Sequence, residues 1–134
     1  MSGRTCIKRF RVRARAISAV RRHAAATLTE WKLGGLIEDG ILITSELATN
    51  AVLHAKGTGD YFELALRRPN GVLVLEVADS YQWRMPELHK PAPDDLSGRG
   101  LFLVDALSEN WGVRPRNPGK TVWAHLAINR VAQP

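Results

Sequence analysis

The sequence lacks the features that define several classes of protein. Cys6 is its only cysteine, so the chain cannot form an internal disulfide or supply a multi-cysteine metal site. No apolar run approaches the roughly 20 residues that a membrane-spanning helix needs, and the basic N-terminus lacks the apolar stretch of a signal peptide. A Walker motif is also missing, because Lys120-Thr121 follows a turn and precedes a strand. We therefore expect a cytoplasmic protein that does not interact with membranes.

The composition is that of one ordinary globular domain. The 134 residues suit a single domain, 1–134, that is large enough to bury a core. Hydrophobic residues make up 45% of the chain and charged residues 24%. The net charge of +6 is compatible with nucleic acid, but no nucleic-acid recognition motif accompanies it, and a nucleotide is an anion too. We interpret residues 9–15, where arginines alternate with apolar residues, as a strand with a solvated basic face.

Apolar periodicity predicts an α+β fold, a two-layer sandwich in which helices cover one face of a mostly antiparallel sheet. Ser18 is a candidate N-cap for the first helix. The segments 69–71 and 117–119 contain proline, asparagine and glycine and are expected to form turns. The apolar run at 72–78 predicts a central strand buried on both faces. The expected strands are 7–15, 61–68, 72–79, 111–116 and 121–128, and the expected helices are 17–31, 36–55 and 99–109.

Residues 80–97 have no periodicity and contain three prolines. A structureless stretch of this length inside a compact domain is uncommon and is often an active-site lid. A disordered surface excursion is the alternative. Among the tryptophans, we expect Trp31, Trp111 and Trp123 to be at least partly buried, whereas Trp83 in this stretch could contact a partner or a ligand.

The second expected helix contains the segment SELATNAVLHA, residues 45–55. Glu46, Asn50 and His54 follow one another at intervals of four and therefore share one stripe of the helix. Asn50 could supply an oxygen ligand to Mg²⁺, and Glu46 could accept a proton or orient a hydroxyl. Glutamate and asparagine on a solvent-exposed helix face would explain the same pattern. We expect His54 to be a packed or hydrogen-bonded histidine, because no second His or Cys completes a metal set.

Two further segments carry candidate binding residues. Asp79 ends the most apolar strand, where a carboxylate can accept a hydrogen bond from an exocyclic amine such as that of adenine, or can simply end the strand in a turn. In the segment DDLSGRGLFLVDAL, Gly98 and Gly100 flank Arg99 at the expected start of a helix. Helix N-termini expose unpaired N–H groups, and glycines let a phosphate approach them closely.

The order of these segments resembles the nucleotide-binding boxes of the Bergerat-fold ATPases. ELATNAVLHA, VADS, SGRGLFLV and GKTVWA occur in that order, and the resemblance covers nearly the whole chain. The likeness extends to the anti-sigma-factor serine/threonine kinase branch of that fold. The resemblance implies a domain that binds ATP with Mg²⁺ and a protein partner such as a sigma factor or an anti-sigma antagonist. It leaves open a homodimer, and it does not favour nucleic acid as a partner.

The resemblance also assigns roles to individual residues. It makes Asn50 the Mg²⁺ ligand, Glu46 the catalytic base and Asp79 the carboxylate that accepts a hydrogen bond from the adenine amine. It makes Thr121 a hydroxyl near the adenine, and 80–97 the ATP lid. The phosphates would lie against the segment Gly98, Arg99, Gly100 and Leu101.

One departure from the family pattern separates two functions. The family usually follows the adenine-binding Asp with glycines, in the pattern D-x-G-x-G, whereas Asp79 is followed by Ser80, Tyr81, Gln82, Trp83 and Arg84. This departure favours a non-catalytic, nucleotide-dependent protein-binding module, because the backbone approaches the base less freely without glycines. The presence of Glu46 favours a serine/threonine kinase that phosphorylates a partner antagonist protein.

Overall fold

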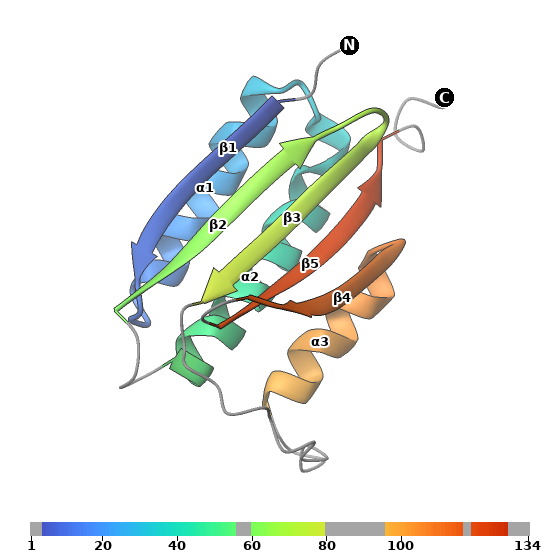
Figure 1. Cartoon of the computed structure of the whole chain (residues 1–134). Coiled ribbons are helices and arrows are strands. Elements are labelled where there is room, and N and C mark those ends of the chain that lie inside the picture. Colours follow the sequence, from blue (N-terminus) through green and yellow to red (C-terminus); the bar gives the residue numbers. More distant parts are fainter. Residues whose placement is uncertain (1–3, 56–59, 80–95, 117–118, 129–134) are drawn as a thin grey trace.

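The computed structural model of the chain is a two-layer α+β sandwich, as predicted (Figure 1). It describes residues 4–55, 60–79, 96–116 and 119–128. The strands are β1 (Arg4–Arg11), β2 (Tyr61–Arg68), β3 (Val72–Asp79), β4 (Asn110–Pro115) and β5 (Lys120–Ala127). The helices are α1 (Ala16–Glu30), the short 3₁₀ helix η1 (Gly34–Leu36), α2 (Ile37–Ala55) and α3 (Leu96–Leu107).

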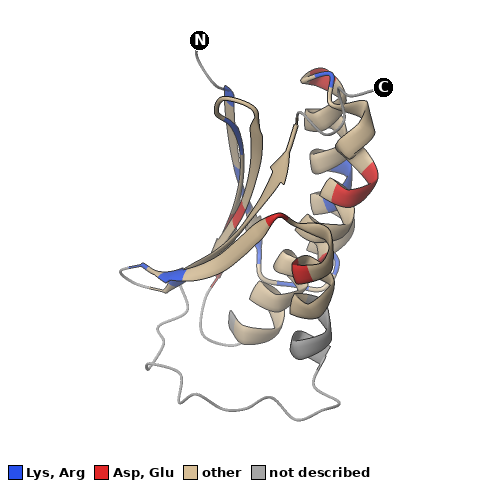
Figure 2. Cartoon of the chain, turned by 90° about the vertical axis from the view of Figure 1, so that its right-hand side faces the viewer, with Lys and Arg blue, Asp and Glu red and all other residues tan. Residues whose placement is uncertain are grey.

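The five strands form one antiparallel sheet in the order β1-β2-β3-β5-β4. Seen edge-on, the sheet carries its helices on one side only (Figure 2). We call the face toward the helices the inner face and the opposite one the outer face. The prediction of a central strand buried on both faces is confirmed, because β3 lies in the middle of the sheet and is buried from Leu73 to Asp79.

The hydrophobic core lies between the inner face and the helices. Alternate residues of a strand point to opposite faces, so every second residue of β2 and β3 contributes to the core. Phe62 of β2 stacks on Phe10 of β1 with ring centroids 5.6 Å apart. Trp31 is buried and Trp111 and Trp123 are half-buried, as predicted. The core residues include Val20 and Leu28 of α1, Ile43, Leu47 and Ala51 of α2, and Leu64, Leu66, Leu73, Leu75 and Val77 of the sheet.

The first strand and helix begin earlier than the sequence pattern predicts. β1 ends at Arg11, because the amide of Arg13 bonds to the carbonyl of Arg11 and turns the chain toward α1. The N-cap of α1 is Arg15, so the prediction that Ser18 caps the helix is wrong. Ser18 lies inside the first turn, where its hydroxyl accepts a 2.7 Å hydrogen bond from Arg22.

β1 is an edge strand with a row of exposed cations. Arg9 and Arg11 are exposed on the outer face, and their guanidinium groups lie 5.6 and 5.2 Å from the ring centre of Tyr61. The prediction of a strand with a solvated basic face is therefore confirmed as far as Arg11. Arg4 and Lys8 of the same strand are also exposed.

The connections of the sheet follow the expected turn chemistry. Gly71 and Gly119 have φ angles of 68° and 94°, a region that favours glycine. The predicted turn at 69–71 joins β2 to β3 where expected, while Asn117 and Pro118 of the second turn lie outside the described residues. Among the helices of the described residues, none combines the length and the apolar character that a membrane span requires.

Candidate functional site

The candidate site lies at one end of the sandwich, where several elements end or begin. The C-terminal ends of α2 and β3 and the N-terminal ends of α3 and β5 all lie at this end, the lower one in Figure 1. Of the expected lid, residues 80–95, including Trp83, lie outside the described residues, and the last two residues belong to α3. The residues that the sequence analysis selected come from these same four elements.

Helix α2 carries the stripe of Glu46, Asn50 and His54 at its C-terminal half. The adjacent face of the helix is anchored in the core by residues such as Leu47 and Ala51. This packing leaves Glu46 half-buried and His54 exposed, while Asn50 is only 5% exposed. The interpretation of the stripe as a solvent-exposed face is therefore wrong for Asn50.

The Asn50 side chain is a buried amide without a hydrogen-bond partner in the part of the chain that the structure describes. The hydroxyls of Thr44 and Thr49 on the same helix bond instead to the carbonyls of Gly40 and Ser45, at 2.9 and 2.7 Å. A buried polar group without a partner costs about 1–3 kcal/mol. Asn50 is thus arranged to bond to water or to a ligand.

Glu46 lies one helical turn before Asn50 and likewise has no ion-pair or hydrogen-bond partner within the part of the chain that the structure describes. Its carboxylate can therefore accept a proton or a hydrogen bond from a group that enters the site. No three His, Cys, Asp or Glu side chains of the described residues lie close enough together to hold a metal ion. A cation at Asn50 would accordingly need most of its oxygen ligands from the bound molecule and water, an arrangement that suits Mg²⁺ with phosphates.

Asp79 ends β3 on the inner face, with only 2% of its surface exposed. Its neighbour across the sheet is Lys120, the first residue of β5. The Nζ atom of Lys120 lies 3.7 Å from Oδ2 of Asp79, and Lys120 itself is only 7% exposed. A carboxylate and an ammonium therefore lie side by side at the buried end of the two central strands.

His54 connects this ion pair to α2. Its Nδ1 lies 3.1 Å from Nζ of Lys120. An ammonium can only donate hydrogen bonds, so the imidazole accepts one at Nδ1 and carries its own proton on Nε2 while Lys120 is charged. The prediction that His54 is a hydrogen-bonded histidine is confirmed. Burial lowers the pKa of Lys120, and the nearby Asp79 carboxylate opposes this shift.

Thr121 does not join this group of residues. It pairs with Ala78, one position away from the Asp79–Lys120 pair, so the pleat of the sheet directs it to the outer face. The inward-facing residue at this end of β5 is Lys120, which was not among the predicted site residues. The alternation of the strand could have identified it. Every second residue of β5 from Val122 onward faces inward, and Lys120 lies two positions before Val122.

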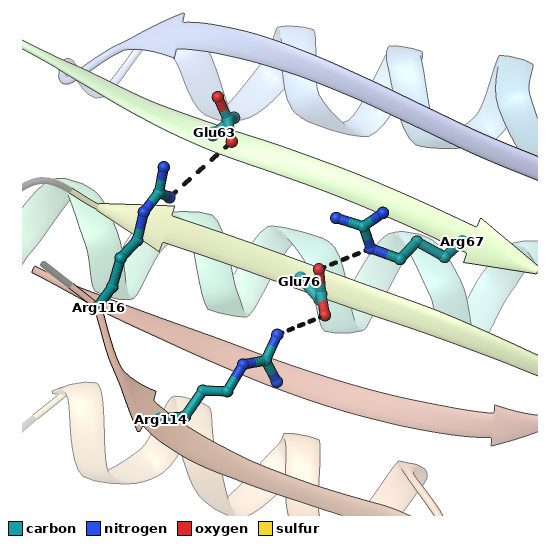
Figure 3. Close-up of polar contacts among 5 residues, drawn as sticks. All are labelled: Glu63, Arg67, Glu76, Arg114 and Arg116. Atoms are coloured by element: carbon teal, nitrogen blue, oxygen red, sulfur yellow. Dashed lines mark hydrogen bonds and ion pairs between the residues drawn. The ribbon is translucent and has the colours of Figure 1, made fainter.

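The outer face beside Thr121 carries a separate set of ion pairs (Figure 3). Glu76 of β3 accepts hydrogen bonds from Arg67 of β2 at 3.0 Å and from Arg114 of β4 at 2.7 Å. Burial alone would raise the pKa of Glu76, but the hydrogen bonds and charges of the two arginines outweigh it and hold that pKa below its ordinary value. Arg116 lies 3.9 Å from Glu63 of β2. These contacts tie together strands that are not all neighbours.

The segment SGRG lies inside α3 and does not precede it. The helix begins at Leu96, so the prediction that it starts near residue 99 is wrong by about one turn. Gly98 and Arg99 belong to the first four residues, whose N–H groups have no acceptor within the helix, whereas Gly100 follows them. Leu101 is half-buried against the core and fixes this turn of the helix. The helix ends at Leu107, because the amide of Glu109 bonds to the carbonyl of His125 in β5.

The comparison with protein families agrees with this arrangement. A family model described as the histidine kinase-like ATPase domain matches residues 10–126, which is well over half of the chain. The match includes every residue discussed above from α2 to β5. No curated protein is similar enough to the chain to count as a match.

Proposed function

Because the chain belongs to the histidine kinase-like ATPase domain family, we propose that it is a regulatory serine/threonine kinase of the anti-sigma-factor type. ATP binding follows from the family itself. The proposal adds Mg²⁺, a protein substrate and the transfer of the γ-phosphoryl group to a serine or threonine of that substrate. It also treats residues 1–134 as a single ATP-binding domain.

The observation that carries the proposal is the buried amide of Asn50, with which none of the described residues forms a hydrogen bond. Asn50 lies on the same helix as Glu46, in the C-terminal part of α2, and this end of α2 lies at the same end of the fold as the end of β3, which is Asp79. Asn50 would hold Mg²⁺ together with the phosphates, and Mg²⁺ would neutralise charge on the phosphates during the transfer. Asp79 would accept a hydrogen bond from the adenine amine. Gly98, Arg99, Gly100 and Leu101 would lie along the phosphates. The N–H groups of the first turn of α3, which have no acceptor within the helix, would be the donors.

The proposed step needs one base and one acceptor hydroxyl. The hydroxyl oxygen of the substrate attacks the γ-phosphorus, the bond from that phosphorus to the bridging oxygen breaks, and ADP leaves. Glu46 takes the proton from the hydroxyl, and its half-buried carboxylate without a described partner supports this role. A positioned general base typically contributes about 10²–10⁴-fold to the rate.

The test compares wild type with Glu46→Gln, which keeps the shape of the side chain and removes its basicity. We expect Glu46→Gln to bind Mg·ATP nearly as well as wild type and to phosphorylate a partner protein about 10²–10⁴-fold more slowly. The partner is found by incubating candidate sigma-factor antagonists with labelled ATP. Glu38→Gln is the matched control, because Glu38 is an exposed glutamate of the same helix. A Glu46→Gln protein that phosphorylates the partner at the wild-type rate would exclude Glu46 as the base.

A non-catalytic module is the second candidate, and the residues after Asp79 favour it. The segment 80–84, Ser-Tyr-Gln-Trp-Arg, lacks the glycines that usually follow the adenine-binding carboxylate in this family. A module of this kind would bind its partner only when ATP is present and would transfer no phosphate. Partner pull-down with ATP, with ADP and without nucleotide, together with the labelling experiment, distinguishes it from the kinase.

A further inference from the structure

The ion pair of Lys120 and Asp79 requires an explanation beyond stability. Lys120 is 7% exposed at an inner-face position of β5, and the following inward residues of the strand, Val122, Ala124 and Leu126, are all apolar. Removing two charges from water is expensive, and a buried ion pair is often no more stabilising than apolar residues of similar volume. A lysine at this position is therefore better explained by a contact with a ligand.

The pair presents an acceptor and a donor next to each other. The carboxylate of Asp79 accepts hydrogen bonds and the ammonium of Lys120 donates them, with 3.7 Å between Oδ2 and Nζ. The hydrogen-bonding edge of adenine has the complementary order, because its N6 amine donates and the adjacent ring nitrogen N1 accepts. One adenine can thus bond to both side chains in the plane of its ring.

We propose that Lys120 is a specificity-determining residue that donates a hydrogen bond to N1 of adenine while Asp79 accepts one from the N6 amine. The proposal rests on the function proposed above, in which Asp79 contacts the adenine amine. The ammonium group rotates about the last bond of its side chain and carries three donors. It can therefore exchange a contact within the protein for the base when a nucleotide enters.

His54 acts as a positioning residue in this arrangement. Its Nδ1, 3.1 Å from Nζ of Lys120, accepts from the ammonium and links it to the helix that carries Asn50. The same helix, α2, would thereby position both the base and the phosphates of the nucleotide. Asp79 from β3 and His54 from α2 together restrict where the ammonium can lie.

The test uses analogues of ATP in which single atoms of the base are changed. Calorimetry measures the affinity of wild type for three nucleotides: ATP, 1-deaza-ATP and purine riboside triphosphate. 1-deaza-ATP has carbon in place of N1, and purine riboside triphosphate lacks the N6 amine. A hydrogen bond to a charged group is worth about a factor of 10 or more in affinity. We therefore expect wild type to bind 1-deaza-ATP at least about 10-fold more weakly than ATP, with a similar loss for purine riboside triphosphate.

The variant Lys120→Met separates the role of the lysine from other effects. It should bind ATP about 10-fold more weakly than wild type and should no longer distinguish ATP from 1-deaza-ATP. Lys8→Met is the matched control, because Lys8 is an exposed lysine of the same sheet, and it should discriminate like wild type. If Lys120→Met does not fold, the wild-type comparison of ATP with 1-deaza-ATP still decides the question.

Each failure has a distinct signature. Equal binding of ATP and 1-deaza-ATP by wild type overturns the role of Lys120 and leaves the proposed function intact. Discrimination that persists in Lys120→Met overturns it as well, because another group must then contact N1. If wild type binds none of the three nucleotides, both the proposed function and this inference are overturned.

Discussion

Replacing Gly112 by alanine should destabilise the pair of strands β4 and β5. A Cβ atom at this position would lie 2.7 Å from Cζ2 and 3.0 Å from Cε2 of the Trp123 indole on the neighbouring strand. Carbon atoms normally approach to about 3.5–4.0 Å, and the rigid indole cannot yield by bending. The His125 ring also packs against the indole, with the ring centroids 4.7 Å apart, and further restricts its movement. The methyl group therefore forces the ring or the strand to move.

The size of the effect follows from two opposing contributions. Overpacking typically costs about 1–3 kcal/mol. The 2.7 Å approach to a rigid indole and the half-buried position of that ring together indicate a cost near the middle of this range, about 2 kcal/mol. Removing a glycine from a strand contributes about 0.5–1 kcal/mol in the opposite direction. The free energy of unfolding should thus fall by about 1 kcal/mol, which corresponds to a decrease in Tm of about 3–5 °C for a domain of this size.

Urea denaturation followed by circular dichroism measures this change, with Gly34→Ala as the matched control. Apart from the adjacent residues and the backbone of its own helix, no atom of the described residues lies within 4 Å of the Cβ position at Gly34. Its substitution should therefore leave the free energy of unfolding within about 0.5 kcal/mol of wild type. A Gly112→Ala protein as stable as wild type, or a Gly34→Ala protein that is equally destabilised, would refute the steric argument.

Three further substitutions test the two faces of the sheet and helix α2. Asn50→Ala should leave the free energy of unfolding unchanged or raise it, because the amide has no partner among the described residues. Its affinity for Mg·ATP should fall at least about 10-fold. A loss of stability above about 1 kcal/mol in urea denaturation would show instead that Asn50 has a structural role. Asp79→Asn should weaken ATP binding more than GTP binding, because the adenine amine loses its acceptor; calorimetric titrations that show equal weakening would contradict this contact. The two arginines lower the pKa of Glu76 in the folded protein. The stability that its ionised carboxylate contributes is therefore complete above the unfolded pKa and is lost as the pH falls through the lowered pKa. Glu76→Gln should accordingly reduce the difference between the urea midpoints at pH 7 and pH 3, and an unchanged difference would argue against the arginine contacts.

The hairpin of β2 and β3 shows what local sequence can predict. The segments 61–68 and 72–79 were predicted with their observed bounds, because the turn chemistry of 69–71 and the apolar run of β3 act within a few residues of each other. β1 was placed too late, because its end depends on a distant partner: the amide of Val12 bonds to the carbonyl of Asp60, just before β2. Alternation of arginines with apolar residues continues past that point and carries no information about it.

The candidate site could be predicted only where it depends on local sequence. Glu46, Asn50 and His54 share a stripe because helix geometry alone decides it. The partner of Asp79 depends instead on the register between β3 and β5, which are separated by α3 and β4 in the chain. A shift of one residue moves every side chain to the other face of a sheet, so the sequence pattern alone could not identify Lys120 as the neighbour of Asp79. Register of this kind is set by tertiary packing. Thr121 was assigned to the adenine by the family resemblance only.

The cations of β1 have a consequence for the behaviour of the protein at high concentration. An edge strand exposes unpaired backbone groups that can recruit the edge of another molecule, and like charges along the edge oppose such pairing. In a contact between two β1 edges, the cations of one molecule would lie close to those of the other: Arg4, Lys8, Arg9 and Arg11. Salt screens charges beyond about 8–10 Å at physiological ionic strength and more strongly at higher concentrations. Colloidal stability should therefore decline as the salt concentration increases, a practical guide for storing and crystallising this protein.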